Sequence, residues 1–289
     1  MLAGAALALL LVLGWAWRTS PFPLQHLERG AATTSPLPLE TADVGARDRH
    51  RPGPALSSYV SARWLQPLIA DLTQRSDAGD AEASFALSRV YSECIWFFDP
   101  SLVEPTGVPS AQRPALRRSA VWLATRCDGI DGREAALGYA RFRRVAADQG
   151  SLPAQIEELF NGALTPVDAT RVDDQRTLIE AALARSDGEA YLVLSRALGY
   201  GAERTNALAP YPTGTPADSG AWMLAACNVG VACGPSSPLL HQLCGTGLLC
   251  GADSVQEALA MTLTVEEMVQ ARERANEVME LSRRIRYGR

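Results

Sequence analysis

The residues best suited to chemistry in this 289-residue chain are its six cysteines: Cys94, Cys127, Cys227, Cys233, Cys244 and Cys250. An even number of cysteines is typical of disulfides in a protein that leaves the cytosol. We expect Cys94 to pair with Cys127 across the Asp99–Pro114 loop. The last four form the block Cys227-x5-Cys233-x10-Cys244-x5-Cys250, which permits local pairing (Cys227–Cys233 with Cys244–Cys250) or crossed pairing (Cys227–Cys244 with Cys233–Cys250).

Zinc is the alternative use of this block. His241 lies three residues before Cys244, so the four cysteines, or three of them with His241, could form a tetrahedral site. The x5 spacings are longer than those of common zinc knuckles, and an oxidising compartment does not protect thiolates. The Cys-x-x-Cys arrangement of redox enzymes is missing. We therefore expect disulfides, and no metal or cofactor.

Catalytic motifs are scarce in this sequence. All 27 basic residues are arginine, which excludes a P-loop lysine, a Schiff-base lysine and a Ser-Lys dyad. Of the three histidines, His26 and His50 precede the folded part, so only His241 is left for Ser-His or Cys-His chemistry. No Gly-x-Ser-x-Gly elbow, His-Glu-x-x-His helix or glycine-rich dinucleotide fingerprint occurs. We predict a chain that is not an enzyme.

Paired carboxylates keep one enzymatic alternative open, an envelope glycan hydrolase. Glu157-Glu158 and Glu266-Glu267 are adjacent on predicted helices, so the members of each pair diverge around the helix axis. Asp173-Asp174 precedes a predicted helix and suits its first turn. The Glu-Ser dipeptide of lytic transglycosylases does not occur.

Aromatic residues suggest a contact surface. The consecutive residues Trp96, Phe97 and Phe98 cannot all face one helical core, so we predict that they form a possible partner surface. The alternative is a loop plug held in place by the Cys94 disulfide. Trp64, Trp122 and Trp222 stand singly on predicted helices, and we expect them in the core.

The N-terminal part of the sequence differs from the rest. Residues 1–18 contain an unbroken apolar run from Leu2 to Trp17, which predicts a transmembrane anchor or a signal segment. Residues 19–54 are rich in proline, threonine and arginine and show no period, which predicts a disordered spacer. We expect a single-pass bacterial inner-membrane protein whose folded domain lies in the periplasm. The alternative is a soluble periplasmic protein after signal cleavage.

Residues 55–289 are predicted to be an all-α domain, with a cysteine-rich C-terminal part at 218–289. Apolar residues recur three and four apart, for example at Ala83, Leu87, Val90 and Tyr91, and again at Met268, Ala271, Ala275, Val278 and Ile285. Ser254-x-x-Glu257 and Thr264-x-x-Glu267 are typical of capping boxes, and Pro238 suits a first helical position. The net charge of −5 argues against a nucleic-acid partner.

Similar segments recur within this domain. Gly79-Asp80-Ala81-Glu82-Ala83 opens one helix, and Ala146-Ala147-Asp148-Gln149-Gly150 followed by Ala154 repeats the pattern. A weaker version comprises Ala181, Ala182, Gly188 and Ala190; the spacings from Ala83 to Ala154 and from Ala154 to Ala190 are 71 and 36 residues. Small residues at such turns let paired helices approach, and each pair buries its open face by stacking on a neighbour. A degenerate copy between the first two would include the helix at Arg118–Cys127.

On these residues, about half of the chain resembles the Sel1-like, tetratricopeptide-related repeat family. The resemblance implies helix-turn-helix repeats stacked as a short α-solenoid that binds a protein or peptide partner and has no catalysis of its own. We therefore expect a non-catalytic, exported interaction scaffold of the bacterial cell envelope. The alternatives are the glycan hydrolase and a neutralising partner of a secreted protein.

Overall fold

The structure is a computed structural model that describes residues 53–95, 109–161, 169–199, 206–245 and 250–288. Within these ranges all regular elements are helical and no strand occurs, which confirms the all-α prediction. The α-helices are α2 (Pro54–Ser61), α3 (Gln66–Asp77), α4 (Ala81–Ile95), α6 (Arg113–Arg126), α7 (Gly132–Asp148), α8 (Leu152–Asn161), α9 (Ala169–Arg185), α10 (Gly188–Ala197), α11 (Pro216–Val229), α12 (Pro238–Gly245), α13 (Val255–Thr262) and α14 (Val265–Tyr287), with a 3-10 turn at Asn206–Leu208.

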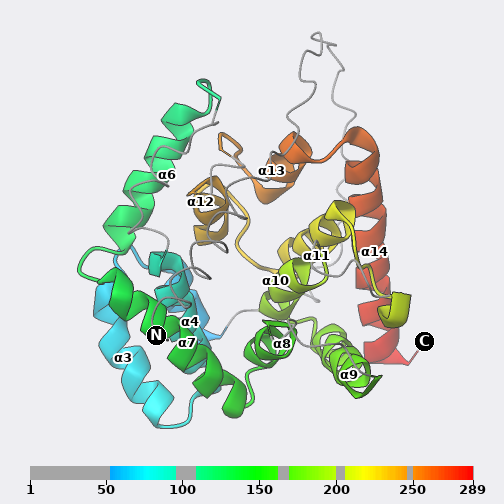
Figure 1. The fold of residues 1–289 in the computed structure, drawn as a ribbon, viewed down its shortest axis with the longest axis horizontal. Helices are drawn as coiled ribbons and strands as arrows, with labels where there is room; N and C mark the ends of the chain where they lie inside the picture. Colours follow the sequence, from blue (N-terminus) through cyan, green and yellow to red (C-terminus); the bar gives the residue numbers. More distant parts are fainter. Residues whose placement is uncertain (1–52, 96–108, 162–168, 200–205, 246–249, 289) are drawn as a thin grey trace, which may run out of the picture. The chain divides into compact units, whose positions relative to one another are not determined.

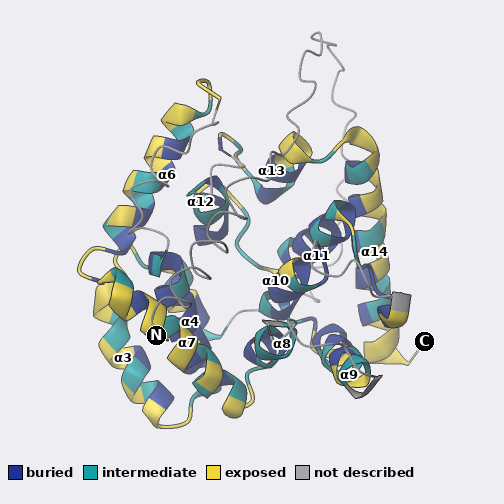
Figure 2. Cartoon of the chain, viewed as in Figure 1, coloured by how far each residue is buried: buried dark blue, intermediate teal, exposed yellow. Residues whose placement is uncertain are grey.

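The helices pack around two hydrophobic clusters. One cluster is built mainly from α2, α3, α4 and α7, where α4 packs directly against both α3 and α7. The other is built from α8 to α14, where α11 packs against α10 and α14. In Figure 2 the buried residues of α10 and α11 are dark blue along most of their length. Trp222 of α11 is fully buried there, as expected.

Helix α6 lies outside these two large clusters and contributes Leu116 to a small third cluster with Cys244 and Cys250. Its main partner is α12, more than a hundred residues later in the chain, and Figure 1 shows the two helices side by side. Because α4 packs directly on α7, α6 is not stacked between them. The helix expected to belong to a degenerate copy around Arg118–Cys127 therefore lies outside the stack of α4 and α7.

The helix pairs α3/α4, α7/α8 and α9/α10 share one turn geometry. One residue in each turn has a positive φ: +90° at Gly79, +93° at Gly150 and +50° at Ser186. The amide of this residue donates to the carbonyl three residues before it, and the amide of the following residue donates to the carbonyl five residues before that one, which is the Schellman pattern. Four residues after each turn residue an alanine is fully buried, at Ala83, Ala154 and Ala190. The 71- and 36-residue spacings thus relate three equivalent turns, although Ser186 rather than Gly188 takes the turn position.

Most of the predicted helix faces and caps are present. Ala83, Leu87, Val90 and Tyr91 are buried, and so are the first four members of the C-terminal stripe. The fifth, Ile285, is 40% exposed because Ser282 takes the inward position one turn earlier and is buried. Thr264 and Glu267 form the predicted capping box. At Ser254 the box is incomplete, since Glu257 accepts from the amide of Asp253 instead.

All six cysteines are paired in disulfides, as predicted. Cys94 bonds to Cys127, with Cα atoms 5.5 Å apart. The C-terminal block pairs locally, Cys227 with Cys233 and Cys244 with Cys250, so the crossed pairing is wrong. Because every sulfur is bonded to another, the cysteine sulfurs do not serve as thiolate ligands for zinc. The described residues contain no group of three or more His, Cys, Asp or Glu side chains arranged to hold a metal ion.

Three predictions fall on other segments. The proposed membrane segment at 1–18, the spacer up to residue 52 and the partner surface Trp96, Phe97 and Phe98 lie outside the described residues. None of the helices in the described ranges is long and apolar enough to cross a membrane. Pro54, assigned to the spacer, is the first residue of α2.

Candidate functional site

A buried polar cluster fixes the inner side of α6. Arg126 at the end of this helix is only 2% exposed, and its Nε donates to Glu93 Oε1 of α4 at 2.6 Å. Its Nη2 donates to Glu93 Oε2 at 3.3 Å and to the backbone oxygen of Tyr59 at 3.0 Å, and Nη1 donates to the carbonyl oxygen of Ala62. The Tyr59 hydroxyl donates to Glu93 Oε2 at 2.7 Å. Every partner of the buried guanidinium is thus supplied by α2, the turn after it, or α4.

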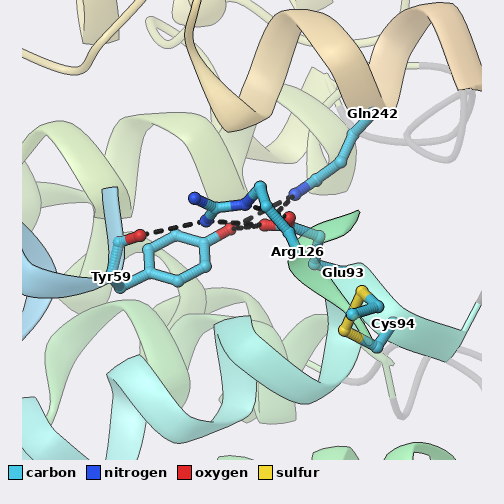
Figure 3. Close-up of a disulfide and its surroundings, with 6 residues drawn as sticks. Tyr59, Glu93, Cys94, Arg126 and Gln242 are labelled. Atoms are coloured by element: carbon cyan, nitrogen blue, oxygen red, sulfur yellow. Dashed lines mark hydrogen bonds and ion pairs between the residues drawn. A yellow bond between two sulfur atoms is a disulfide. The ribbon is translucent and has the colours of Figure 1, made fainter. Parts of the chain in front are cut away.

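Helix α12 completes this cluster from the other side. The Gln242 side-chain amide lies 3.2 Å from the Tyr59 hydroxyl and 3.4 Å from Glu93 Oε2, and donates to both (Figure 3). Burial, together with the charge of Glu93, raises the pKa of Tyr59 well above its usual range, so this hydroxyl remains a donor. An ion pair held in this way is costly to break, because either charge left alone is buried without compensation.

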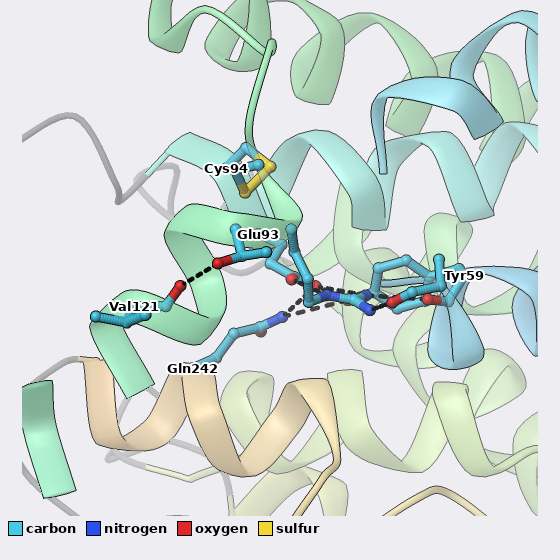
Figure 4. Close-up of polar contacts among 9 residues, drawn as sticks. Tyr59, Glu93, Cys94, Val121 and Gln242 are labelled. Carbon is cyan, nitrogen blue, oxygen red and sulfur yellow. Dashed lines mark hydrogen bonds and ion pairs between the residues drawn. A yellow bond between two sulfur atoms is a disulfide. The ribbon is translucent and has the colours of Figure 1, made fainter. Parts of the chain in front are cut away.

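The disulfide lies directly beside the ion pair in the sequence. Glu93 immediately precedes Cys94, and Arg126 immediately precedes Cys127. Figure 4 shows the Cys94 disulfide and the polar cluster at the same end of α6, with Val121 of α6 turned away from the cluster. The backbone amide of Leu65 also donates to the carbonyl of Arg126 at 2.8 Å. The C-terminal end of α6 is therefore held by a covalent bond, an ion pair and a backbone hydrogen bond.

His241 of α12 holds the middle of α6. Its imidazole stacks on the Trp122 ring, with centroids 4.0 Å apart, and its Nδ1 lies 3.0 Å from Ser119 Oγ. Burial, with a smaller contribution from the charge of Arg126, lowers the pKa of His241 to about 4. The ring is therefore neutral at pH 7.

The Ser119–His241 pair has the composition of a nucleophile and its base but lacks two requirements for that role. A general base works best when its pKa is near the working pH, and a pKa of about 4 makes His241 a weak base. The orienting acidic partner of a triad is also missing, since the imidazole makes no other hydrogen bond within the described part of the chain. A 220 Å³ pocket adjoins the pair and includes Arg118 and Asp253. We interpret the pair as a contact that fixes α6 against α12.

The outer side of α6 borders an open groove with a volume of about 660 Å³. Its lining residues are Ala62, Arg63, Arg117, Arg118, Val121, Trp122, Thr125 and Arg126. Arginines provide most of the polar lining, and no acidic side chain is among these residues. Val121 is 67% exposed at the groove. The groove therefore combines positively charged side chains with one exposed apolar side chain. The opposite side of α6 is fixed by the buried polar cluster, the disulfide and His241.

Two of the three tryptophans expected in the core lie at or near this groove. Trp64 is 52% exposed, and the Arg63 guanidinium lies over its ring, 5.2 Å from the centroid. Helix α2 ends at Ser61, so Trp64 lies on the turn before α3, and Leu65 takes the buried position instead. Trp122 is partly buried, with the Arg126 guanidinium 4.6 Å from its ring centroid. Only Trp222 has the predicted core position.

A second pocket, of about 620 Å³, adjoins the turns of the three helix pairs. Its acidic lining residues are Glu82, Asp187 and Glu189. Glu82 accepts from a backbone amide of α2, and Asp187 caps the start of α10. Glu189 Oε2 lies 3.8 Å from Arg89 Nε, and neither atom has a hydrogen-bond partner. Burial raises the pKa of Glu189 even though the charge of Arg89 opposes this effect.

The adjacent carboxylates, which we predicted to diverge around their helix axes, have separate partners. Glu157 accepts from the Tyr139 hydroxyl at 2.6 Å, and Glu158 accepts from Arg143 Nε at the same distance. Glu267 belongs to the capping box of α14, and its neighbour Glu266 is exposed. Asp173 and Asp174 are exposed in the second turn of α9, which begins at Ala169, so the prediction that they precede this helix is wrong. Sequence reasoning missed Glu189, whose only sequence signal was its position in a helix-opening turn.

Comparison of the chain with protein-family models, with curated proteins and with solved structures found no match. The Sel1-like resemblance therefore stays a prediction, and the function is argued from the residues of the site.

Proposed function

We propose that this chain is a non-catalytic, exported scaffold of the bacterial cell envelope that binds a polypeptide partner in the groove on α6. The observation that carries the proposal is the groove itself, which is open, lined by arginines and an exposed valine, and backed by a helix fixed at several points. A surface held rigidly before binding loses little conformational entropy when a partner docks.

The compartment is part of this proposal. All six cysteines form disulfides, and structural disulfides persist mainly outside the cytosol. The apolar segment at 1–18 would tether the chain to the inner membrane or direct its export, and the residues between this segment and α2 would set the reach of the folded domain. In this picture the three equivalent turns are those of a short Sel1-like solenoid, which presents the groove to the periplasm.

Site-specific photo-crosslinking in living cells tests this function. A photoreactive amino acid replaces Val121, which is exposed at the groove, in the full-length chain. The matched control carries the same group at Val265, which is 76% exposed at the start of α14. We expect one or a few discrete protein adducts from position 121 and none of these from position 265. Identical adduct patterns, or adducts only with cytosolic proteins, would contradict the proposal.

The identity of the crosslinked protein also distinguishes the scaffold function from the alternative, in which the chain neutralises a secreted protein. A scaffold would be crosslinked to a resident protein of the envelope. A neutralising partner would be crosslinked to a secreted protein whose activity falls when the purified chain is added.

Glu189 favours one second candidate function, the glycan hydrolase. A buried carboxyl group with a raised pKa in a pocket with other carboxylates is the arrangement that a general acid needs. If this function holds, the purified chain cleaves peptidoglycan, Glu189→Gln abolishes the cleavage, and the exposed control Glu277→Gln does not. Absence of cleavage by the wild-type chain would remove this candidate.

A further inference from the structure

The first described residue of the chain lies at the pocket of about 620 Å³ that adjoins the turns of the three helix pairs, here called the turn pocket. This residue, Gly53, is one of the lining residues and packs tightly against Glu82, since a Cβ on Gly53 would lie 2.0 Å from Glu82 Oε2. Glu82 Oε1 in turn accepts from the amide of Leu56 in the first turn of α2. The residues immediately before Gly53 therefore begin at the turn pocket.

The turn pocket carries more acidic than basic side chains. Its ionisable lining residues are Glu82, Arg185, Asp187 and Glu189. Glu82 and Asp187 each accept from a backbone amide, which uses only part of the acceptor capacity of a carboxylate. Arg185 is exposed, so dissolved ions screen its charge. Charges of one sign gathered around a concave surface raise the local concentration of oppositely charged groups.

Glu189 is the lining carboxylate with the least support from hydrogen-bond donors. Its Oε2 is buried without a partner, and Arg89 Nε, 3.8 Å away on a side chain that is only 6% exposed, is too far for a hydrogen bond. Burial raises the pKa of Glu189, and the charge of Asp187 adds to this effect. Arg89 and, more weakly, Arg196 oppose the rise without cancelling it. A further guanidinium in the pocket would stabilise the charged form of Glu189.

The sequence just before Gly53 has the complementary charge. Residues 47–51, Arg-Asp-Arg-His-Arg, contain three arginines and one acidic residue, and we call them the basic segment. Arg51 and Arg49 precede Gly53 by two and four residues, so at most about 7 and 14 Å of extended chain separates them from it. In an extended chain, residues two apart point to the same side.

We propose that the basic segment docks in the turn pocket, where its arginines pair with the carboxylates of Asp187 and Glu189. Arg49 and Arg51 are the two nearest the pocket along the chain, and guanidinium groups can bind carboxylates through two parallel hydrogen bonds. Their aliphatic stems suit apolar lining residues such as Val231. A segment joined to its site by a few residues has an effective concentration in the millimolar range, so it outcompetes a basic peptide of a partner.

This docking goes beyond the proposed function and does not depend on the groove on α6. If the basic segment is fastened to the turn pocket, only the residues before it set the reach of the folded domain.

Photo-crosslinking within the purified full-length chain tests the docking. A photoreactive amino acid replaces His50, which lies between the two arginines and outside the helical domain. The matched control carries the same group at Ala32, farther from the pocket along the chain. We expect mass spectrometry to find adducts of position 50 with peptides that contain lining residues of the turn pocket, and few such adducts from position 32.

Charge variants of the segment test the chemistry without altering the helical core. With the probe at position 50, Arg49→Gln/Arg51→Gln should lower the yield of pocket adducts about tenfold, because charge-assisted hydrogen bonds are lost. The control Arg18→Gln/Arg29→Gln removes the same charge from earlier in the chain and should leave the yield unchanged. Raising the salt concentration should lower the yield from the unaltered segment.

Equal yields from the two double variants, or adducts of position 50 spread evenly over the domain, would overturn the proposal. Mixing 15N-labelled with unlabelled chain distinguishes adducts within one copy from adducts between copies. Pocket adducts that form only between copies would overturn it and assign the pocket to a second copy. Adducts with lipid in place of pocket peptides would also overturn it. Each of these results leaves the test of the α6 groove at position 121 unaffected.

Discussion

Replacing Arg126 by methionine should sharply destabilise the folded domain. Methionine fills a similar volume but removes the donors that serve Glu93, Tyr59 and Ala62. The Glu93 carboxylate then stays buried, and among the described residues only the Tyr59 hydroxyl and the Gln242 amide remain as its partners. Breaking a buried pair from one side costs about 3–5 kcal/mol. For a domain of this size each kcal/mol lowers Tm by about 2–4 °C, so we expect a decrease of roughly 6–20 °C.

Urea denaturation followed by far-UV circular dichroism measures this loss, with Arg75→Met as the matched control. Arg75 pairs with Asp80 at 2.7 Å, but both side chains are about one-third exposed, so this variant should lose less than about 1 kcal/mol. The double variant Arg126→Met/Glu93→Met should recover part of the loss, because no uncompensated charge remains. A cost below about 1 kcal/mol for Arg126→Met, or additive costs in the double variant, would refute this reasoning.

Three further predictions concern other parts of the fold. The pKa of His241 in the folded chain is about 4, below its ordinary 6.5, so its contribution to stability is present above pH 6.5 and is lost as the pH falls toward 4. The variant His241→Gln should reduce this pH dependence of the unfolding free energy by about 2 kcal/mol, a figure that allows for partial solvent exposure. Thermal melts between pH 4 and 7 measure the difference. The entropy of closing a loop in the unfolded chain predicts that removing the Cys94–Cys127 disulfide, with a sequence separation of 33, lowers the free energy of unfolding by about 3.7 kcal/mol. Removing either disulfide with a separation of six should lower it by about 2.2 kcal/mol. Urea titrations measure these losses, and the opposite ranking would contradict the loop-entropy argument. Gly138→Ala places a Cβ 2.6 Å from the buried ring of Tyr91 and should cost about 1–3 kcal/mol in the same assay, whereas an unchanged midpoint would mean that the ring moves aside freely.

The helical class and the first disulfide were predictable because their signals are local or nearly so. The stripe Ala83–Tyr91 and the box at Thr264 depend on spacings of three and four residues, which the helix geometry fixes. The third turn was misplaced because Ser186 adopts a backbone conformation that glycine usually takes. The sequence pattern marked Gly188 instead, two residues too late.

The site was largely hidden in the sequence because its parts are distant. The side chains of Tyr59 and Gln242 are 183 residues apart and meet only after α12 packs on α6. One sequence signal could have predicted the buried ion pair. The two disulfide-bonded residues Cys94 and Cys127 follow charged residues of opposite sign, so pairing the cysteines places Glu93 and Arg126 close together. The groove depends on which side of α6 is covered, and this follows from the docking of α12.

The three disulfides connect the cysteines in the order in which they occur along the chain, first with second, third with fourth and fifth with sixth. Six cysteines allow fifteen connectivities, and this is the one in which each bond can close before the next pair has been synthesised or translocated. A chain that emerges N-terminus first can therefore form its native linkages in order as each pair becomes exposed to an oxidant.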